Sequence, residues 1–125
     1  AASQSEAHIV VVDDEKAIGH SLGTVFKSKG YQVQVFNNPL KALDWFSDKE
    51  NQADLLLIDY MMPGMDGIEL IQRVRKDRPD LPVILMTGLQ DAEAEKRFEE
   101  ADVTEVLNKP FDVNRLLSCV QNKLE

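Results

Sequence analysis

Five polar side chains follow short apolar runs in this sequence, and their types are able to do chemistry together. They are, in chain order, Asp13, Asp14, Asp59, Thr87 and Lys109. Each of them alone has a plain structural explanation, such as an acid that ends a strand before a turn. A carboxylate pair, a lone carboxylate, a hydroxyl and an amine at the ends of four apolar runs seldom arise from packing alone. Together they indicate one functional site.

The three carboxylates would need a partner if they lay close together. Two carboxylates about 4 Å apart repel by roughly 4 kcal/mol even at an effective dielectric of ~20. Asp13, Asp14 and Asp59 would therefore favour a bound cation or shared protons. Oxygen ligands suit Mg²⁺, with Mn²⁺ as the alternative ion, because Mg²⁺ binds through one or two carboxylates and substrate phosphate oxygens. Zinc is disfavoured, since His8 and His20 form no cluster of the ligands that it prefers.

A phosphoryl group that approached Asp59 would meet the cation on one side and Lys109 on another. Thr87 could donate a hydrogen bond to the same group, so the set forms an electrostatic cradle for phosphoryl transfer. A carboxylate is already ionised at neutral pH, so Asp59 could attack phosphorus without an adjacent base and form an aspartyl phosphate. At the carboxyl end of a strand in an open sheet, this acid is expected to be exposed rather than buried.

Strands and helices that could position these residues alternate along the chain. Continuous apolar runs favour strands buried on both faces, and a run that alternates apolar and polar residues favours an edge strand. The strands are expected at 9–12, 31–35, 55–58, 83–86 and 106–107. Five such strands with helices between them predict an α/β domain, a doubly wound five-stranded parallel sheet in the order 2-1-3-4-5 with helices on both faces. Strands one and three would be neighbours, which would bring all five polar residues to one edge.

The first two helices have clear end signals. Gly30 is the expected C-terminal cap of the first helix, because glycine readily adopts the left-handed conformation there. Asn38 followed by Pro39 is the expected start of the second helix. That helix would bury an apolar stripe that includes Leu40 and Phe46.

The last two helices differ in how firmly they should be anchored. The segment from Asp91 to Glu100 is rich in acids and offers only Ala92, Ala94 and Phe98 for burial, so it should be a solvated, weakly anchored helix. In the final helix Asp112 is the expected N-cap, and Phe111 should pack on Leu116 as a hydrophobic staple. The residues expected to point inward there are Val113, Leu116, Leu117, Val120 and Leu124.

Composition limits the classes of protein to consider. A chain of 125 residues with 43% hydrophobic residues is one domain with a sizeable core, and residues 1–7 look like a linker or an artificial remnant rather than a signal peptide. The folded domain is expected over 8–125. A net charge of −8, from 14 basic and 22 acidic residues, argues against direct nucleic-acid binding. No apolar run approaches the ~20 residues of a membrane span, and the single Cys119 fits a reducing compartment, which predicts a cytoplasmic protein.

The motifs resemble those of a known family, the receiver domain of two-component response regulators, and the resemblance covers residues 8–125. The family pattern is an acidic pair after the first strand, an acceptor aspartate after the third, Thr or Ser after the fourth and Lys-Pro after the fifth. In this sequence these are Asp13-Asp14, Asp59 in the run DYMMPGMDG, Thr87 and Lys109-Pro110. Together these motifs are highly specific.

The resemblance implies a flavodoxin-like receiver fold that acts as a phosphorylation-dependent signalling switch. It implies that Asp14, Asp59 and the backbone carbonyl of Met61 ligate Mg²⁺ directly and that Asp13 acts largely through water. It also implies a phosphohistidine donor on a sensor histidine kinase or a histidine phosphotransfer protein, and a cis peptide bond before Pro110. Such a domain is not a conventional enzyme, although it catalyses its own phosphorylation and dephosphorylation.

One position departs from the family pattern. Val106 lies three residues before Lys109, where family members usually carry a Tyr or Phe that changes rotamer on phosphorylation. Valine is stiff at χ1 and too short to report in that way. The signal is therefore expected to pass through residues 88–101, which comprise the loop Gly88-Leu89-Gln90 and the acidic helix, rather than through the last helix.

Three functions other than the phosphorylation-dependent switch are possible for such a fold. A Mg²⁺-dependent aspartyl phosphatase of the haloacid-dehalogenase type would carry a second acid two residues after the nucleophile, where this chain has Met61. A pseudo-receiver that only binds partners would lack the acceptor, the acid pair or the lysine, and none is missing. A flavodoxin-like cofactor binder would need a Gly-rich phosphate loop after the first strand, which this sequence does not have. The sequence does not indicate the output partner.

Overall fold

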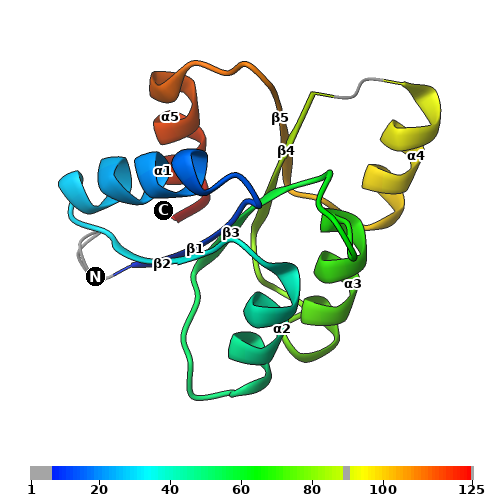
Figure 1. Ribbon diagram of the computed structural model, residues 1–125, viewed down its shortest axis with the longest axis horizontal. Coiled ribbons are helices and arrows are strands. Elements are labelled where there is room, and N and C mark those ends of the chain that lie inside the picture. Colours follow the sequence, from blue (N-terminus) through cyan, green and yellow to red (C-terminus); the bar gives the residue numbers. More distant parts are fainter. Residues whose placement is uncertain (1–6, 89–90, 125) are drawn as a thin grey trace.

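Five strands alternate with five helices over residues 7–88 and 91–124, which are the residues that the computed structural model describes (Figure 1). In chain order the elements are β1 His8–Val12, α1 Lys16–Ser28, β2 Gln32–Phe36, α2 Pro39–Ser47, β3 Leu55–Asp59, α3 Gly67–Asp77, β4 Val83–Thr87, α4 Ala92–Glu100, β5 Glu105–Asn108 and α5 Val113–Leu124. The expected alternation of strands and helices is confirmed.

The strands form one parallel sheet in the order β2-β1-β3-β4-β5. Helices α1 and α5 cover one face, and α2, α3 and α4 cover the other (Figure 1). The predicted doubly wound fold and strand order are therefore confirmed. β1 and β3 are neighbours at the point where the strand order reverses, which is where ligands bind in open α/β sheets.

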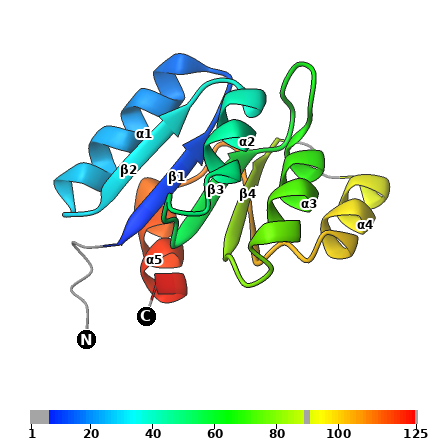
Figure 2. The same cartoon turned by 90° about the horizontal axis from the view of Figure 1, so that it is seen from below.

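The three inner strands are buried and β2 is at the edge. Every residue of β3 and β4 is buried, as their continuous apolar sequences predict for strands covered on both faces. β2 has no fully buried residue. Figure 2 shows β2 at one side of the sheet with α1 running beside it.

The predicted helix ends are confirmed. Gly30 follows α1 with a φ of 94°, in the left-handed region that favours glycine. The side chain of Asn38 accepts a hydrogen bond of 2.8 Å from the backbone N–H of Leu40, and Pro39 is the first residue of α2. Asp112 accepts from the N–H of Asn114 at 2.7 Å, as expected of the cap before α5.

Three apolar side chains lie in solvent against expectation. Leu40 is 61% exposed because it is two residues, or about 200° of helical rotation, from Ala42, whose side chain faces the core. Val113 is 44% exposed as the first residue of α5, since helical side chains lean toward the N-terminus and therefore beyond the core. Ala92 holds the same first position in α4 and is also exposed. The inward stripes of α2 and α5 are thus narrower than their sequences predict.

The start of the fold differs slightly from the expected boundary. The carbonyl of Ala7 accepts a hydrogen bond of 2.9 Å from the N–H of Gln32, and its side chain packs against the core. Residues 1–6 of the expected linker lie outside the described residues, as do Leu89 and Gln90 of the expected signalling loop. Among the described helices, none is long and apolar enough to cross a membrane.

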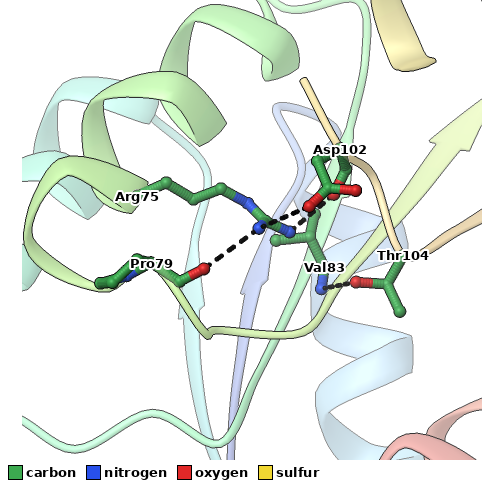
Figure 3. Close-up of polar contacts among 5 residues, drawn as sticks. All are labelled: Arg75, Pro79, Val83, Asp102 and Thr104. Atoms are coloured by element: carbon green, nitrogen blue, oxygen red, sulfur yellow. Dashed lines mark hydrogen bonds and ion pairs between the residues drawn. The ribbon is translucent and has the colours of Figure 1, made fainter. Parts of the chain in front are cut away.

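A polar cluster fixes the amino-terminal end of β4 (Figure 3). The Arg75 guanidinium donates to the carbonyl of Asp102 at 2.8 Å and to that of Pro79 at 3.3 Å, and it lies 3.7 Å from the Asp102 carboxylate. The backbone N–H of Val83 donates to the hydroxyl of Thr104 at 3.0 Å. This cluster joins α3 to the turn after α4 at the end of the sheet opposite the predicted site.

Candidate functional site

The predicted site residues meet at the carboxyl edge of the sheet. Each of Asp13, Asp14 and Asp59 offers an oxygen, and these oxygens all lie within 4.8 Å of one another. Asp13 and Asp14 follow β1, and Asp59 ends the neighbouring strand β3. Thr87 ends β4, and its carbonyl accepts a hydrogen bond of 2.8 Å from the N–H of Lys109. The parallel register therefore assembles all five residues that the sequence singled out.

Lys109 reaches across the site from the loop after β5. Its Nζ lies 3.2 Å from Oδ1 of Asp59 and 3.5 Å from Oδ2 of Asp13. The peptide bond between Lys109 and Pro110 is cis, as the resemblance implies. The amine thus lies between two carboxylates that belong to adjacent strands.

The site is more buried than the sequence predicts. Asp13 is 0% exposed, Asp59 6% and Thr87 1%, so the expectation of an exposed Asp59 is wrong. Asp59 is the last residue of β3 and pairs with Met86 of β4 on one side, while β1 flanks β3 on the other. Being at a strand end therefore does not expose this carboxylate.

Burial changes the proton affinities of the two buried acids and the lysine. Desolvation raises the pKa of Asp59 from 3.8 to about 6, against the opposing pull of the Lys109 amine. Burial also raises the pKa of Asp13, although the backbone N–H of Glu15 donates to its carboxylate at 2.9 Å. Burial lowers the pKa of Lys109, but the charges of Asp13 and Asp59 outweigh that effect and raise it above its usual value.

The carboxylates have the composition of a site for a hard cation. Oδ2 of Asp13 is buried and accepts no hydrogen bond from the described residues. The amine of Lys109 lies 3.5 Å from it and forms an ion pair. A buried carboxylate oxygen that accepts no hydrogen bond, beside two further carboxylates and a single amine, suits an oxygen-coordinated divalent ion. Asp13, Asp14 and Asp59 therefore fit Mg²⁺ by their chemistry.

Gly67 is a site residue whose specific role the sequence did not reveal. A Cβ atom at this position would lie 2.5 Å from the carbonyl oxygen of Asp59 and 3.1 Å from Cα of Tyr60, so only glycine fits. The N–H of Gly67 donates to the carbonyl of Tyr60 at 2.8 Å. The preceding Asp66 caps α3 by accepting from the N–H of Glu69 at 2.9 Å. The start of α3 thus packs directly on the backbone of Asp59.

Arg97 links α4 to the turn after Asp59, and sequence reasoning missed it. Its Nη1 donates to the hydroxyl of Tyr60 at 2.8 Å and to Oδ2 of Asp66 at 2.9 Å. Phe98 packs edge-to-face on the Tyr60 ring, with centroids 4.9 Å apart. No local sequence signal marks Arg97, because its partners lie 31 and 37 residues away along the chain.

Val106 occupies a half-buried position on β5. It pairs with Leu85 of β4 and packs against the core on the side of α4. The side chain of Met61, two residues after Asp59, is 62% exposed.

Comparison with known proteins places the chain in a family. The family model "Response regulator receiver domain" matches residues 9–121. Sporulation initiation phosphotransferase F of Bacillus subtilis (strain 168) is 34% identical over 116 residues, which are 93% of this chain and 92% of that protein. The structure of Vibrio cholerae chemotaxis protein CheY4 superposes with a TM-score of 0.86 at 26% identity, over 94% of this chain and 98% of that chain.

Other relatives are much longer than this chain. The DNA-binding transcriptional regulator NtrC of Azospirillum brasilense is 35% identical over 120 residues, which are 96% of this chain but 24% of that protein. The chain therefore spans about a quarter of that relative's length. From the family match, the full-length relative and the shared fold, this chain belongs to the response regulator receiver domain family.

Proposed function

We propose that this receiver domain is a phosphorylation-dependent switch in which Asp59 accepts a phosphoryl group. The observation that carries the proposal is the Lys109 amine, which lies 3.2 Å from Asp59. Asp59 belongs to a cluster of three carboxylates whose oxygens lie within 4.8 Å of one another. The phosphodonor is a phosphohistidine on a sensor histidine kinase or a histidine phosphotransfer protein, as in the systems that the family serves.

The chain's own residues account for most of the transfer. A carboxylate oxygen of Asp59 attacks phosphorus, the P–N bond of phosphohistidine breaks, and the imidazole leaves with the electron pair. Lys109 balances negative charge on the phosphoryl oxygens, and the hydroxyl of Thr87 donates to one of them. Asp14, Asp59 and the carbonyl of Met61 would hold Mg²⁺, with Asp13 acting through water, and the ion would supply further charge neutralisation.

The same groups support hydrolysis of the aspartyl phosphate by water. The domain therefore catalyses its own phosphorylation and dephosphorylation without being a conventional enzyme. An aspartyl phosphatase with turnover is disfavoured, because the position of its general acid holds Met61, whose thioether has no proton to give. A pseudo-receiver is disfavoured because the acceptor, the acid pair, the hydroxyl and the lysine all meet at one edge.

An apolar groove beside Lys109 offers a place for the phosphodonor. It has a volume of 550 Å³ and is lined by Ile18 and Leu22 of α1 together with Pro110 and Phe111. Because Lys109 also lines this groove, a helix docked there would carry its phosphohistidine next to Asp59. We assign the groove to the histidine-bearing helix of the kinase or phosphotransfer protein.

Metal removal tests the proposed function. Incubation of the 125-residue chain with acetyl phosphate and Mg²⁺ should add the mass of one phosphoryl group in intact-mass spectrometry. Excess EDTA should abolish the addition, because the carboxylate cluster then has no counterion to offset the charge of the incoming phosphate. A protein that gains no phosphoryl group with Mg²⁺ would be a pseudo-receiver.

Phosphorylation should change α4 more than α5. α4 buries only Ala94 and Phe98, and Arg97 joins it to the turn that follows Asp59. With beryllofluoride and Mg²⁺ as a phosphoryl mimic, we expect larger changes of backbone amide shift and hydrogen exchange in α4 than in α5. Arg97→Met should reduce the α4 response without preventing phosphorylation. Large changes confined to α5, with α4 silent, would refute this route.

A further inference from the structure

A basic groove runs between α1 and the edge strand β2, away from the apolar groove assigned to the phosphodonor. It has a volume of 570 Å³, and its charged lining includes Lys16, Lys27 and Lys41 together with Asp13. Asp13 is fully buried and shares the Lys109 amine with Asp59, so the charges that the groove exposes to solvent are those of the three lysines. The groove is therefore positive in a protein whose net charge is −8.

The three lysines have no acidic partner in the fold. Lys16, Lys27 and Lys41 take part in none of the ion pairs formed among residues 7–88 and 91–124, and all three are exposed. Three unpaired amines around one groove favour an anionic occupant. Acidic residues outnumber basic ones by 22 to 14 in this chain, so scarcity of carboxylates does not explain the lack of partners.

The outer edge of β2 offers backbone N–H and C=O groups to another strand. β2 pairs with β1 on one side only, and the N–H of Gln32 and the carbonyl of Phe36 point toward β1. In a parallel ladder the intervening residues, Val33 and Val35, direct their N–H and C=O groups away from β1. These are the groups that a peptide adds to when it extends a sheet at its edge.

Two glycines allow α1 to lie very close to this strand. A Cβ at Gly19 or at Gly23 would lie 3.0 Å from a methyl carbon of Val35, so larger side chains would push α1 away. The groove extends along α1 from Lys16 to Lys27, which is about 16 Å at 1.5 Å per residue. About five residues of extended chain cover the same distance. Figure 2 shows α1 and β2 running side by side.

We infer that the groove between α1 and β2 binds an extended acidic peptide segment of a partner protein, which adds to the sheet beside β2. Backbone hydrogen bonds to Val33 and Val35 hold the segment, and its acidic side chains pair with Lys16, Lys27 and Lys41. Lys16 and Lys27 are about 16 Å apart along α1, a distance that about five residues of extended chain cover. Acids near the two ends of such a segment therefore reach both lysines.

Binding of a labelled probe tests the inference. The probe is a fluorescein-labelled heptapeptide of alternating Glu and Val, followed by fluorescence anisotropy with the 125-residue chain. The double variant K27E/K41E should weaken binding by about 10-fold or more, because two attractive pairs become repulsive. The control K29E/K49E changes the net charge equally at exposed lysines that do not line the groove, and it should bind as the wild type does.

Two further measurements separate strand addition from simple charge attraction. On peptide binding, the amides of Val33 and Val35 should exchange more slowly, whereas those of Gln32 and Gln34 already donate to β1 and should change little. Phosphorylation by acetyl phosphate should be the same in K27E/K41E as in the wild type, which confirms that the variant folds. Equal weakening by both double variants, unchanged exchange at Val33 and Val35, or equal binding of a probe with Gln in place of Glu would overturn the inference.

Discussion

Asp59→Asn should abolish phosphoryl labelling by acetyl phosphate and Mg²⁺, as measured by intact mass. An amide nitrogen or oxygen carries no negative charge, so it is a far weaker nucleophile toward phosphorus than a carboxylate. Asp59 is the acid closest to the Lys109 amine, at 3.2 Å, and it keeps 6% of its surface exposed. Asp13 is fully buried, so it is a poor candidate for attack on an external donor.

The control is Asp80→Asn, at an exposed aspartate in the connection between α3 and β4. It changes the net charge by the same amount and should leave labelling unchanged. Circular dichroism should show that both variants fold. Labelling that persists in Asp59→Asn at the wild-type rate would assign the acceptor to another residue.

Without divalent ions, the domain should lose stability as the pH rises from about 4 to about 7. The folded pKa of Asp59 is about 6 and its unfolded value is 3.8, so between these values the folded state binds more protons than the unfolded state. The stability that protonated Asp59 contributes is fully present below its unfolded pKa and is lost as the pH rises through its folded pKa. A shift of about two units corresponds to a loss on the order of 2–3 kcal/mol. The raised pKa of Asp13 adds a loss in the same direction.

Asp59→Asn removes the largest part of this pH dependence. In chemical denaturation with EDTA, the variant should be less sensitive to pH than the wild type and more stable at pH 7. Its melting temperature there should rise by about 5–10 °C, since each kcal/mol is worth a few degrees in a domain of this size. Asp80→Asn should keep the wild-type pH dependence. Identical pH profiles for Asp59→Asn and the wild type would show that burial of this carboxylate does not limit stability.

Addition of Mg²⁺ at pH 7 should reverse the loss in the wild type. A ligand that binds only the folded state stabilises it by an amount that grows with ligand concentration. The reversal should be absent or much smaller in Asp59→Asn, which offers one carboxylate fewer.

The sequence alone determined the fold and which five polar residues meet at one edge of the sheet. Continuous apolar runs that alternate with helical patterns leave few topologies other than a parallel sheet with helices on both faces. In such a sheet every strand ends at the same edge, so Asp59, Thr87 and Lys109 converge whatever the details of packing. The end signals at Gly30 and Asn38 are local as well, because they depend on residues within a few positions along the chain.

Only the tertiary structure decided how deeply the site is buried and what holds it. The burial of Asp59 depends on its neighbours in β1 and β4 and on the close approach of Gly67, which strand position does not predict. The exposure of Leu40 and Val113 depends on which side of a helix meets the sheet. These properties arise where distant segments meet.

The long-range polar contacts also depend on how distant segments pack together. Arg97 finds Tyr60 and Asp66 across more than thirty residues, and no local pattern marks the three as partners. In the sequence, nothing distinguishes Lys16, Lys27 and Lys41 from ordinary solvated lysines. Only the packing of α1 and α2 around β2 brings them to one groove. The periodicity of a segment determines whether it forms a strand or a helix. A contact between two elements depends instead on how they pack, and the local sequence pattern does not predict that packing.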